Sequence, residues 1–261
     1  MPPSYAVEVS NLFFYYLTPR KERLFPALPF KRLVFEKKYA LEDINFHMRA
    51  GRITALLGKN GSGKTTLIKL ITGARTPQKG SVKVFGDTPT KAKSRIGLCL
   101  GGTLVYHRLT GRENLEYFGK LYNVENLPAR IKELSEMLDL GKNLDQLVES
   151  YSYGMKTKLA LARAMVHRPE LLILDEPTLG IDIHIALQIR NFIKSLNCTV
   201  LLTTHYMEEA QTLADDLCII DAGKILSQGE KSHVLNTYGA SDAAEAFIKA
   251  LDLQDQMQVA L

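Results

Sequence analysis

Apolar and polar residues alternate in two short stretches near the start of the chain. Residues 5–10 and 44–48 follow this alternation, which predicts two strands that bury one face each. Uninterrupted apolar runs predict further strands that are buried on both faces, at 53–57, 171–174, 199–203 and 217–220. The sequence Asp221-Ala222-Gly223-Lys224 predicts a hairpin turn directly after the last of these runs.

Between the apolar runs, the spacing of apolar residues changes to three and four, which predicts helices. The stretch 103–150 has this pattern, for example at Ile131, Leu134 and Leu138. Further helices are expected at about 65–73, 154–167, 183–196, 207–214 and from Ser232 onward. Because strands alternate with helices, we expect an α/β core with parallel strands, joined by a small antiparallel β subdomain and a helical subdomain.

Composition narrows the class of protein. With 46% hydrophobic and 23% charged residues, the chain has the balance of a soluble globular protein. No apolar run approaches the roughly 18 residues of a membrane-spanning helix, and the first residues lack the pattern of a secretory signal. Cys99, Cys198 and Cys218 are widely spread, so we expect buried, reduced thiols in a cytosolic protein.

The net charge of +5 is concentrated in one segment. Between Arg20 and Lys38 lie seven basic residues against two acidic ones, and the rest of the chain is neutral. A generally basic surface for nucleic acid is therefore excluded, and we expect no nucleic-acid partner. Three prolines exclude a continuous helix here. Two interpretations of the basic insertion 17–39 stay open: a solvated surface loop, or an arm against a membrane surface or a partner.

A phosphate-binding pattern, G-x-x-x-x-G-K-[ST], lies between a predicted strand and a predicted helix. Its glycines let backbone N–H groups converge on phosphate oxygens at the start of the helix. We expect Lys64 to reach the β- and γ-phosphates and the Thr65 hydroxyl to bind Mg²⁺. The predicted nucleotide-binding residues of this loop are Gly58, Lys59, Asn60, Gly61, Ser62, Gly63, Lys64, Thr65 and Thr66.

Two adjacent carboxylates end the apolar run 171–174. Asp175 suits the role of a Mg²⁺ ligand, acting through a water molecule, and Glu176 suits that of the base that activates the attacking water. Carboxylates at the end of a buried strand need partners, since their desolvation is costly. Asp175 and Glu176 are therefore predicted to be functional residues and not surface charges.

The order of motifs resembles the ATP-binding subunits of ABC (ATP-binding cassette) transporters over about residues 5–230. Tyr151-Ser152-Tyr153-Gly154-Met155-Lys156 resembles the signature usually written LSGGQ, in a variant similar to drug and polysaccharide exporters. The resemblance implies that Ser152 and Gly154 contact ATP, that Asp182 is the aspartate of the D-loop, and that His205 senses the γ-phosphate.

Two positions of the family pattern are less regular. The resemblance implies an aromatic residue that stacks on adenine, which we place at Tyr16, with Tyr15 and Tyr39 as alternatives. The Q-loop glutamine that should follow the run 95–100 is absent, and Gly101-Gly102 occupies its place.

The resemblance implies an ABC ATPase fold for residues 1–261 as a single domain. A RecA-like core with its β subdomain would span 5–100 and 155–230, the helical subdomain 101–154, and a helical tail 231–261. It further implies a homodimer around two ATP molecules that powers separate transmembrane permease subunits from the cytoplasmic face of the membrane. The signature variant favours export of a drug, lipid or polysaccharide. An importer-type subunit and a non-transport ABC ATPase are the alternatives.

Overall fold

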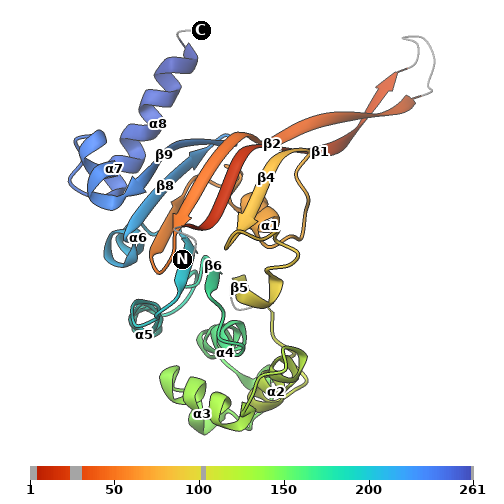
Figure 1. The fold of residues 1–261 in the computed structure, drawn as a ribbon, viewed down its shortest axis with the longest axis vertical. Helices are drawn as coiled ribbons and strands as arrows, with labels where there is room; N and C mark the ends of the chain where they lie inside the picture. The colour runs from red at the N-terminus through yellow and green to blue at the C-terminus, as the bar shows by residue number, and fades with distance from the viewer. Residues whose placement is uncertain (1–4, 24–30, 101–103, 260–261) are drawn as a thin grey trace.

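The computed structural model describes residues 5–23, 31–100 and 104–259, which form two sheets with helices around them (Figure 1). The larger sheet has six strands in the order β5-β6-β7-β3-β8-β9. Its strands pair in parallel except for β9, which is antiparallel to β8. Their bounds are β3 Ile53–Leu57, β5 Ile96–Leu100, β6 Leu171–Asp175, β7 Thr199–Thr203, β8 Asp216–Asp221 and β9 Lys224–Glu230.

Alternation along β6 and β7 divides the core into two layers. Leu171, Ile173 and Leu201 pack with the antiparallel strands and with helix α1, whereas Leu172 and Leu202 pack on the other face with α4 and α5. Both faces of these strands are therefore covered, which explains their uninterrupted apolar sequences. The helices are α1 Lys64–Ile71, α2 Gly111–Leu121, α3 Leu127–Met137, α4 Tyr153–Met165, α5 Ile183–Lys194, α6 Met207–Leu213, α7 Lys231–Thr237 and α8 Ala243–Val259.

Helices α2, α3 and α4 lie together at one end of the molecule (Figure 1). Helix α2 begins with a capping box, in which the Thr110 side chain accepts from the Glu113 backbone and the Glu113 side chain accepts from the Thr110 backbone. Leu115 of α2 and Leu134 of α3 are buried against α4. The predicted α/β fold with an antiparallel β subdomain and an inserted helical subdomain is confirmed.

The second sheet has the strand order β2-β1-β4, with β1 Tyr5–Arg23, β2 Lys31–Arg49 and β4 Lys79–Val84. The sequence predicted a first strand at 5–10 and left the basic insertion 17–39 open as a solvated loop or an arm. The strand is longer than predicted, because β1 and β2 run through the described part of the insertion as paired antiparallel strands, as far as Arg23 and Lys31. Strand β4 pairs with β1 only up to Phe13, so beyond that point the hairpin projects as a two-stranded arm (Figure 1).

Residues 15–23 and 31–39 form the arm, and one of its strands contains a proline. Pro19 lies opposite Phe35, beyond the last residue that β4 pairs with. Proline has no backbone N–H, and strands tolerate it at an edge that needs no donor. Pro19 is therefore compatible with the ribbon.

None of the helices in the described ranges combines the length and the apolar character that crossing a membrane requires. The cysteines lie in or beside the large sheet, where burial raises the pKa of Cys99 to about 12 and that of Cys198 to about 11. Burial also raises the pKa of Cys218. All three side chains are therefore protonated thiols at neutral pH.

A cluster of charges joins the two sheets. Asp216, the first residue of β8, has a side chain that is only 8% exposed. Its carboxylate accepts hydrogen bonds from the guanidinium groups of Arg49 at the end of β2 and Arg52 before β3, with Arg52 Nη2 3.0 Å from Asp216 Oδ1. Since Asp216 has two cationic partners, this contact couples the antiparallel sheet to the centre of the parallel one.

Asp216→Asn tests the contribution of this cluster to stability. Loss of the carboxylate should lower the free energy of unfolding by about 1–3 kcal/mol, because charged hydrogen bonds at a buried acceptor are lost. Urea unfolding measures this value. Glu230→Gln is the matched control, since Glu230 lies 3.7 Å from Arg49 but is 54% exposed. The control should stay within about 0.5 kcal/mol of the natural chain, and equal losses in both variants would contradict the assignment.

Candidate functional site

The phosphate-loop motif connects β3 to α1. Gly61 and Gly63 have φ angles of 82° and 115°, a region that favours glycine. A Cβ atom at Gly58 would lie 2.4 Å from the backbone oxygen of Ile220, so the loop passes too close to β8 for any side chain there. The motif residues thus form a compact turn whose last residue, Lys64, is also the first residue of the helix.

Lys64 lies at the mouth of this turn. Its Nζ donates to the backbone oxygens of Gly58 at 2.6 Å and Lys59 at 3.1 Å. Burial lowers the pKa of Lys64, while the nearby carboxylates of Glu176 and Asp175 raise it. The ammonium group is therefore held partly desolvated, which strengthens its attraction for an incoming phosphate.

The two carboxylates lie where predicted, at the end of β6. Thr203, the last residue of β7, donates its hydroxyl to Asp175 Oδ1. The backbone N–H of Glu176 donates to the Thr203 carbonyl at 3.0 Å and lies 3.2 Å from its hydroxyl. Glu176 has a φ of 53°, an uncommon conformation for a residue other than glycine. Such strain is typical of functional positions, and here it turns the chain sharply after Asp175.

Glu176 and His205 touch each other. His205 follows β7, and its Nδ1 lies 2.7 Å from Glu176 Oε2, while its backbone N–H donates to the same oxygen at 3.4 Å. The Glu176 side chain is 20% exposed and the His205 side chain 47% exposed. The Glu176 carboxylate and the His205 imidazole, which can each bind a water or a phosphate oxygen, are therefore adjacent and solvent-accessible.

A cavity of about 480 Å³ joins these parts into one site. It is lined by the phosphate loop, by both carboxylates and by residues of the arm, and the residues concerned are Tyr16, Thr18, Lys38, Tyr39, Ala40, Asn60, Gly61, Gly63, Lys64, Thr65, Thr66, Asp175 and Glu176. The Thr65 hydroxyl and the Asp175 carboxylate belong to the same cavity, and these oxygen ligands fit a Mg²⁺ ion that is shared with a phosphate.

Of the three candidate aromatic residues, Tyr16 lies deepest in this site. Its hydroxyl is 3.3 Å from the Thr66 hydroxyl, and its ring meets that of Phe14 edge-on. Tyr39 also borders the cavity, but its ring contacts Tyr15, which is not among the lining residues, and Tyr39 is 49% exposed.

The other predicted contacts lie outside this cavity. Ser152 caps α4 by accepting from the Met155 backbone at 3.2 Å, and Asp182 caps α5 by accepting from the His184 backbone at 2.8 Å. Gly154 packs so closely on α5 that a Cβ would lie 2.5 Å from the Ile185 side chain. The cavity of one chain thus contains neither signature residue nor Asp182. The Gly101-Gly102 position lies outside the described residues.

Sequence reasoning missed three contributors to the site. Thr203 orients both acidic residues, and its place directly before Thr204-His205 was the only signal. Thr18 and Lys38 reach the cavity from the arm, a segment in which the sequence predicted no strand.

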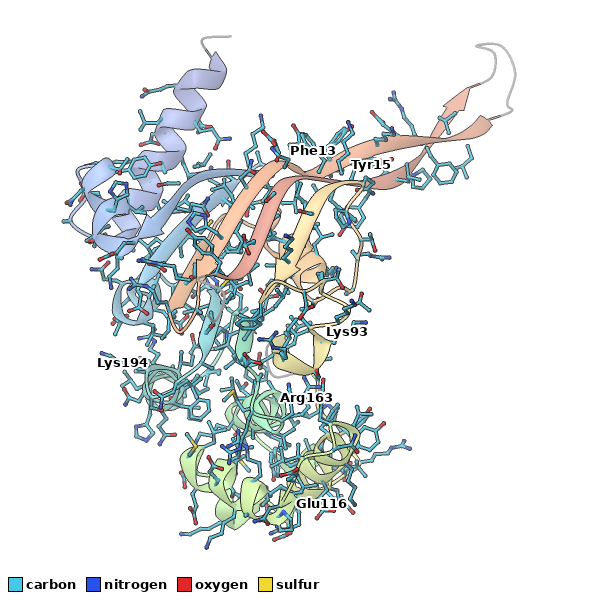
Figure 2. The ribbon with its side chains drawn as sticks, viewed as in Figure 1. Phe13, Tyr15, Lys93, Glu116, Arg163 and Lys194 are labelled. Atoms are coloured by element: carbon cyan, nitrogen blue, oxygen red, sulfur yellow. The ribbon has the colours of Figure 1, made fainter. Side chains whose placement is uncertain are left out.

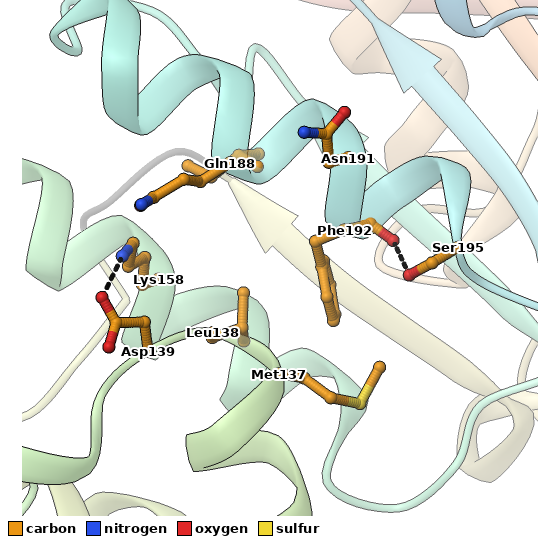
Figure 3. Close-up of a pocket in the computed structure, with 9 residues that line it drawn as sticks. Met137, Leu138, Asp139, Lys158, Gln188, Asn191, Phe192 and Ser195 are labelled. Atoms are coloured by element: carbon orange, nitrogen blue, oxygen red, sulfur yellow. Dashed lines mark hydrogen bonds and ion pairs between the residues drawn. The ribbon is translucent and has the colours of Figure 1, made fainter.

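A second cavity, of about 420 Å³, lies between the end of α3, α4 and α5 (Figure 3). Phe192, Met137 and Leu138 form its apolar wall, and Lys158 lies 3.8 Å from Asp139 at its rim. None of the residues that line it belongs to the motifs described above. Figure 2 shows the described side chains on all of the helices and strands.

Comparisons with known proteins agree with this geometry. The family model described as ABC transporter matches residues 41–179. The ABC transporter ATP-binding protein NatA of Bacillus subtilis is 36% identical over 222 residues, which cover 81% of this chain and 90% of that protein. A linearmycin resistance ATP-binding protein, LnrL, of the same organism is 34% identical, and the match covers 84% of this chain and 73% of that protein. A Nod factor export ATP-binding protein of Rhizobium meliloti is 40% identical, and the match covers 76% of this chain and 62% of that protein.

Solved structures with low identity share the fold. The ATP-binding subunit of an ABC transporter superposes with a TM-score of 0.79 at 24% identity, and covers 94% of this chain and 99% of that one. A dimeric ATP-binding cassette in a post-hydrolysis state, bound to ADP and phosphate, superposes with a TM-score of 0.70 at 22% identity, and covers 86% and 98%.

Gly63→Ala should impair nucleotide binding more than Gly61→Ala. Both residues have positive φ, so both variants carry the backbone strain, but a Cβ at Gly63 would also lie 2.6 Å from the Leu41 side chain and 3.0 Å from the Ala40 oxygen. Around Gly61 there is nothing within 4 Å. We expect at least about tenfold weaker ATP binding for Gly63→Ala than for Gly61→Ala, in line with the 1–3 kcal/mol of overpacking. Titration calorimetry measures the ATP affinity of both variants. Equal affinities would show that the contact of Gly63 with Leu41 and Ala40 does not matter for binding.

Proposed function

Because this chain belongs to the ABC transporter family of ATP-binding proteins, we propose that it hydrolyses ATP as one half of a homodimer that powers a separate export permease. The contact between Glu176 and His205 at the edge of the phosphate-loop cavity carries the proposal. It supports the proposal because a carboxylate and an imidazole beside the phosphate loop suit the roles of general base and γ-phosphate contact. The family membership and the fold support this arrangement.

In this proposal each residue has one task. The loop N–H groups and Lys64 bind the β- and γ-phosphates, and Tyr16 stacks on the adenine. Thr65 and Asp175 would hold Mg²⁺, whose charge would stabilise the phosphates during the reaction. Glu176 accepts the proton of the attacking water, and His205 orients Glu176 and the γ-phosphate. Thr203 supports the step because it fixes the direction of Asp175 and Glu176.

The homodimer follows from the positions of Ser152, Gly154 and Asp182. These residues lie outside the cavity of their own chain, although the family pattern assigns them to ATP. The exposed start of α4, capped by Ser152, suits binding of phosphate charge through its N–H groups. In a symmetric pair, the α4 start of each chain would cover the cavity of the other, which accounts for one set of motifs per chain.

An exposed apolar patch suits the contact with the permease. Leu104, Tyr106, Tyr117, Leu121 and Tyr122 are all at least 38% exposed, and they lie on α2, on the segment before it and directly after its last residue. Tyr106, Tyr117 and Phe118 pack ring against ring, which makes the patch rigid. Scattered apolar residues are normal on surfaces, whereas gathered ones mark contacts. Binding to a permease here would place the subunit at the cytoplasmic face of the membrane. The resistance and Nod factor export proteins among the relatives support export.

The arm suits contact with the membrane surface. Leu17, Leu33 and Phe35 are between 53% and 62% exposed, and Lys37 lies opposite Leu17. Basic residues near anionic lipid contribute on the order of 1 kcal/mol each. A ribbon with exposed apolar and basic side chains can therefore bind the surface of an anionic bilayer without spanning it.

Glu176→Gln should keep ATP binding but slow hydrolysis by about 10²–10⁴, the usual contribution of a general base. The amide has nearly the same shape but cannot accept the proton, so the ATP-bound dimer should accumulate. Phosphate release and size-exclusion chromatography with ATP measure the two effects. Lys64→Ala is the contrasting variant, which should lose ATP binding and the dimer together. Normal hydrolysis by Glu176→Gln would overturn the assignment of the base.

Reversing five charges of the arm should weaken binding to anionic vesicles at least about tenfold, given the contribution of each basic residue. The residues to change are Arg20, Lys21, Arg23, Lys31 and Arg32. Sedimentation with phosphatidylglycerol vesicles, at low and high salt, measures binding, and phosphatidylcholine vesicles give the neutral baseline.

A matched variant reverses five exposed lysines outside the arm, namely Lys69, Lys120, Lys132, Lys142 and Lys194. It carries the same change in net charge and should keep most of the binding. The ATPase rate of the subunit alone should not change in either variant. If both variants lose binding equally, net charge and not the arm attracts the chain to the lipid.

A further inference from the structure

Helix α6 carries a carboxylate that belongs to none of the nucleotide motifs. Glu209 is 0% exposed, and it lies four residues after His205. A buried carboxylate is costly unless it has partners. Its partners therefore indicate what the residue does.

These partners come from the segments on either side of the reaction site. The Thr178 hydroxyl donates to Glu209 Oε1 at 3.0 Å, and Thr178 is the second residue after Glu176. Arg190 of α5 places its Nε 3.7 Å from the same oxygen, and α5 is the helix that Asp182 caps. The buried carboxylate of Glu209 thus contacts the segment after Glu176 and helix α5. It also lies four residues after His205 in the sequence.

The pair with Arg190 is close but not fully hydrogen-bonded. Within the described residues, Glu209 Oε2 and Arg190 Nε have no hydrogen-bond partner. Burial raises the pKa of Glu209, and the Thr204 and Thr178 hydroxyls and Arg190 oppose this effect. The negative charge of Glu176 also raises this pKa, so the two carboxylates sense each other.

We propose that Glu209 is a positioning residue, which holds Glu176, His205 and the helix capped by Asp182 in one register for ATP hydrolysis. This inference rests on the ATPase function proposed above. Its physical basis is that the buried Thr178 donates a hydrogen bond to Glu209 Oε1, and that Arg190, whose side chain is 16% exposed, forms an ion pair with the same oxygen. Without that acceptor the segment after Glu176 loses its anchor, and misplacement of a reacting group by 1 Å can cost about 10²-fold in rate.

Glu209→Gln tests the role of the charge. The amide oxygen still accepts from Thr178, but the negative charge that faces Arg190 is removed. We expect kcat for ATP to fall at least about fivefold while KM for ATP stays within about twofold, because the misplacement affects the reaction and not the binding of ATP. Glu208→Gln is the matched control, since Glu208 also lies 3.7 Å from Arg190 but is 82% exposed. Its kcat and KM should both stay within about twofold of the natural chain.

Two further variants test the pathway. Thr178→Val removes the hydroxyl at nearly constant volume and should lower kcat in the same way. Arg190→Gln combined with Glu209→Gln should be no slower than the slower single variant, because residues that act through one contact are not additive.

The outcomes separate this inference from the proposed function. If the natural chain does not hydrolyse ATP, the proposed function fails and the inference fails with it. If the natural chain hydrolyses ATP and Glu209→Gln matches Glu208→Gln in kcat, only the inference is overturned. Thermal unfolding reports the folded fraction. In both Glu209→Gln and Thr178→Val, activity could fall only because fewer chains are folded, with kcat per folded chain unchanged. That result would also overturn the inference.

Discussion

The parallel pairing of β7 with its two neighbours is the constraint on which the site depends. Thr203 at the end of β7 lies opposite Asp175 of β6 on one side and Leu56 of β3 on the other. The carboxyl ends of the strands therefore meet at one edge, where ligands bind in open α/β sheets. A shift of one residue in this register would turn each side chain to the opposite face, and the hydroxyl of Thr203 would no longer meet Asp175.

Charge at this edge is balanced within the chain. Lys64 loses water because it is buried, and the two carboxylates at the end of β6 favour its charged form. The same carboxylates are held by hydrogen bonds from β7 and from His205. Each of these polar groups therefore has an opposite charge or a hydrogen-bond partner beside it, which offsets the cost of removing it from water. Glu176, whose backbone is in the left-handed region, is the residue whose carboxylate meets His205.

The sequence predicted the parts of the site that are local in the chain. The phosphate loop, the two carboxylates and His205 each follow an apolar strand, and a short motif contains its own turn chemistry. The parts that it missed depend on pairing over long distances. Glu209 has the sequence environment of an ordinary polar residue on a helix, and only the fold brings it to Thr178, 31 positions earlier. Strand β4, rich in lysine, serine and glycine, lacks the apolar content that marked the other strands, because four of its six residues are exposed.

The arm shows the same limit more sharply, because its density of charge and proline pointed away from regular structure. Pairing with β2 overrides those local preferences, since each residue of the ribbon has a backbone partner across the hairpin. Tyr16 and Lys38 pair with each other and border the nucleotide cavity, whereas Leu17 and Lys37 pair with each other, are exposed and do not line it. The same two strands therefore supply part of the cavity wall and an exposed surface with apolar and basic side chains.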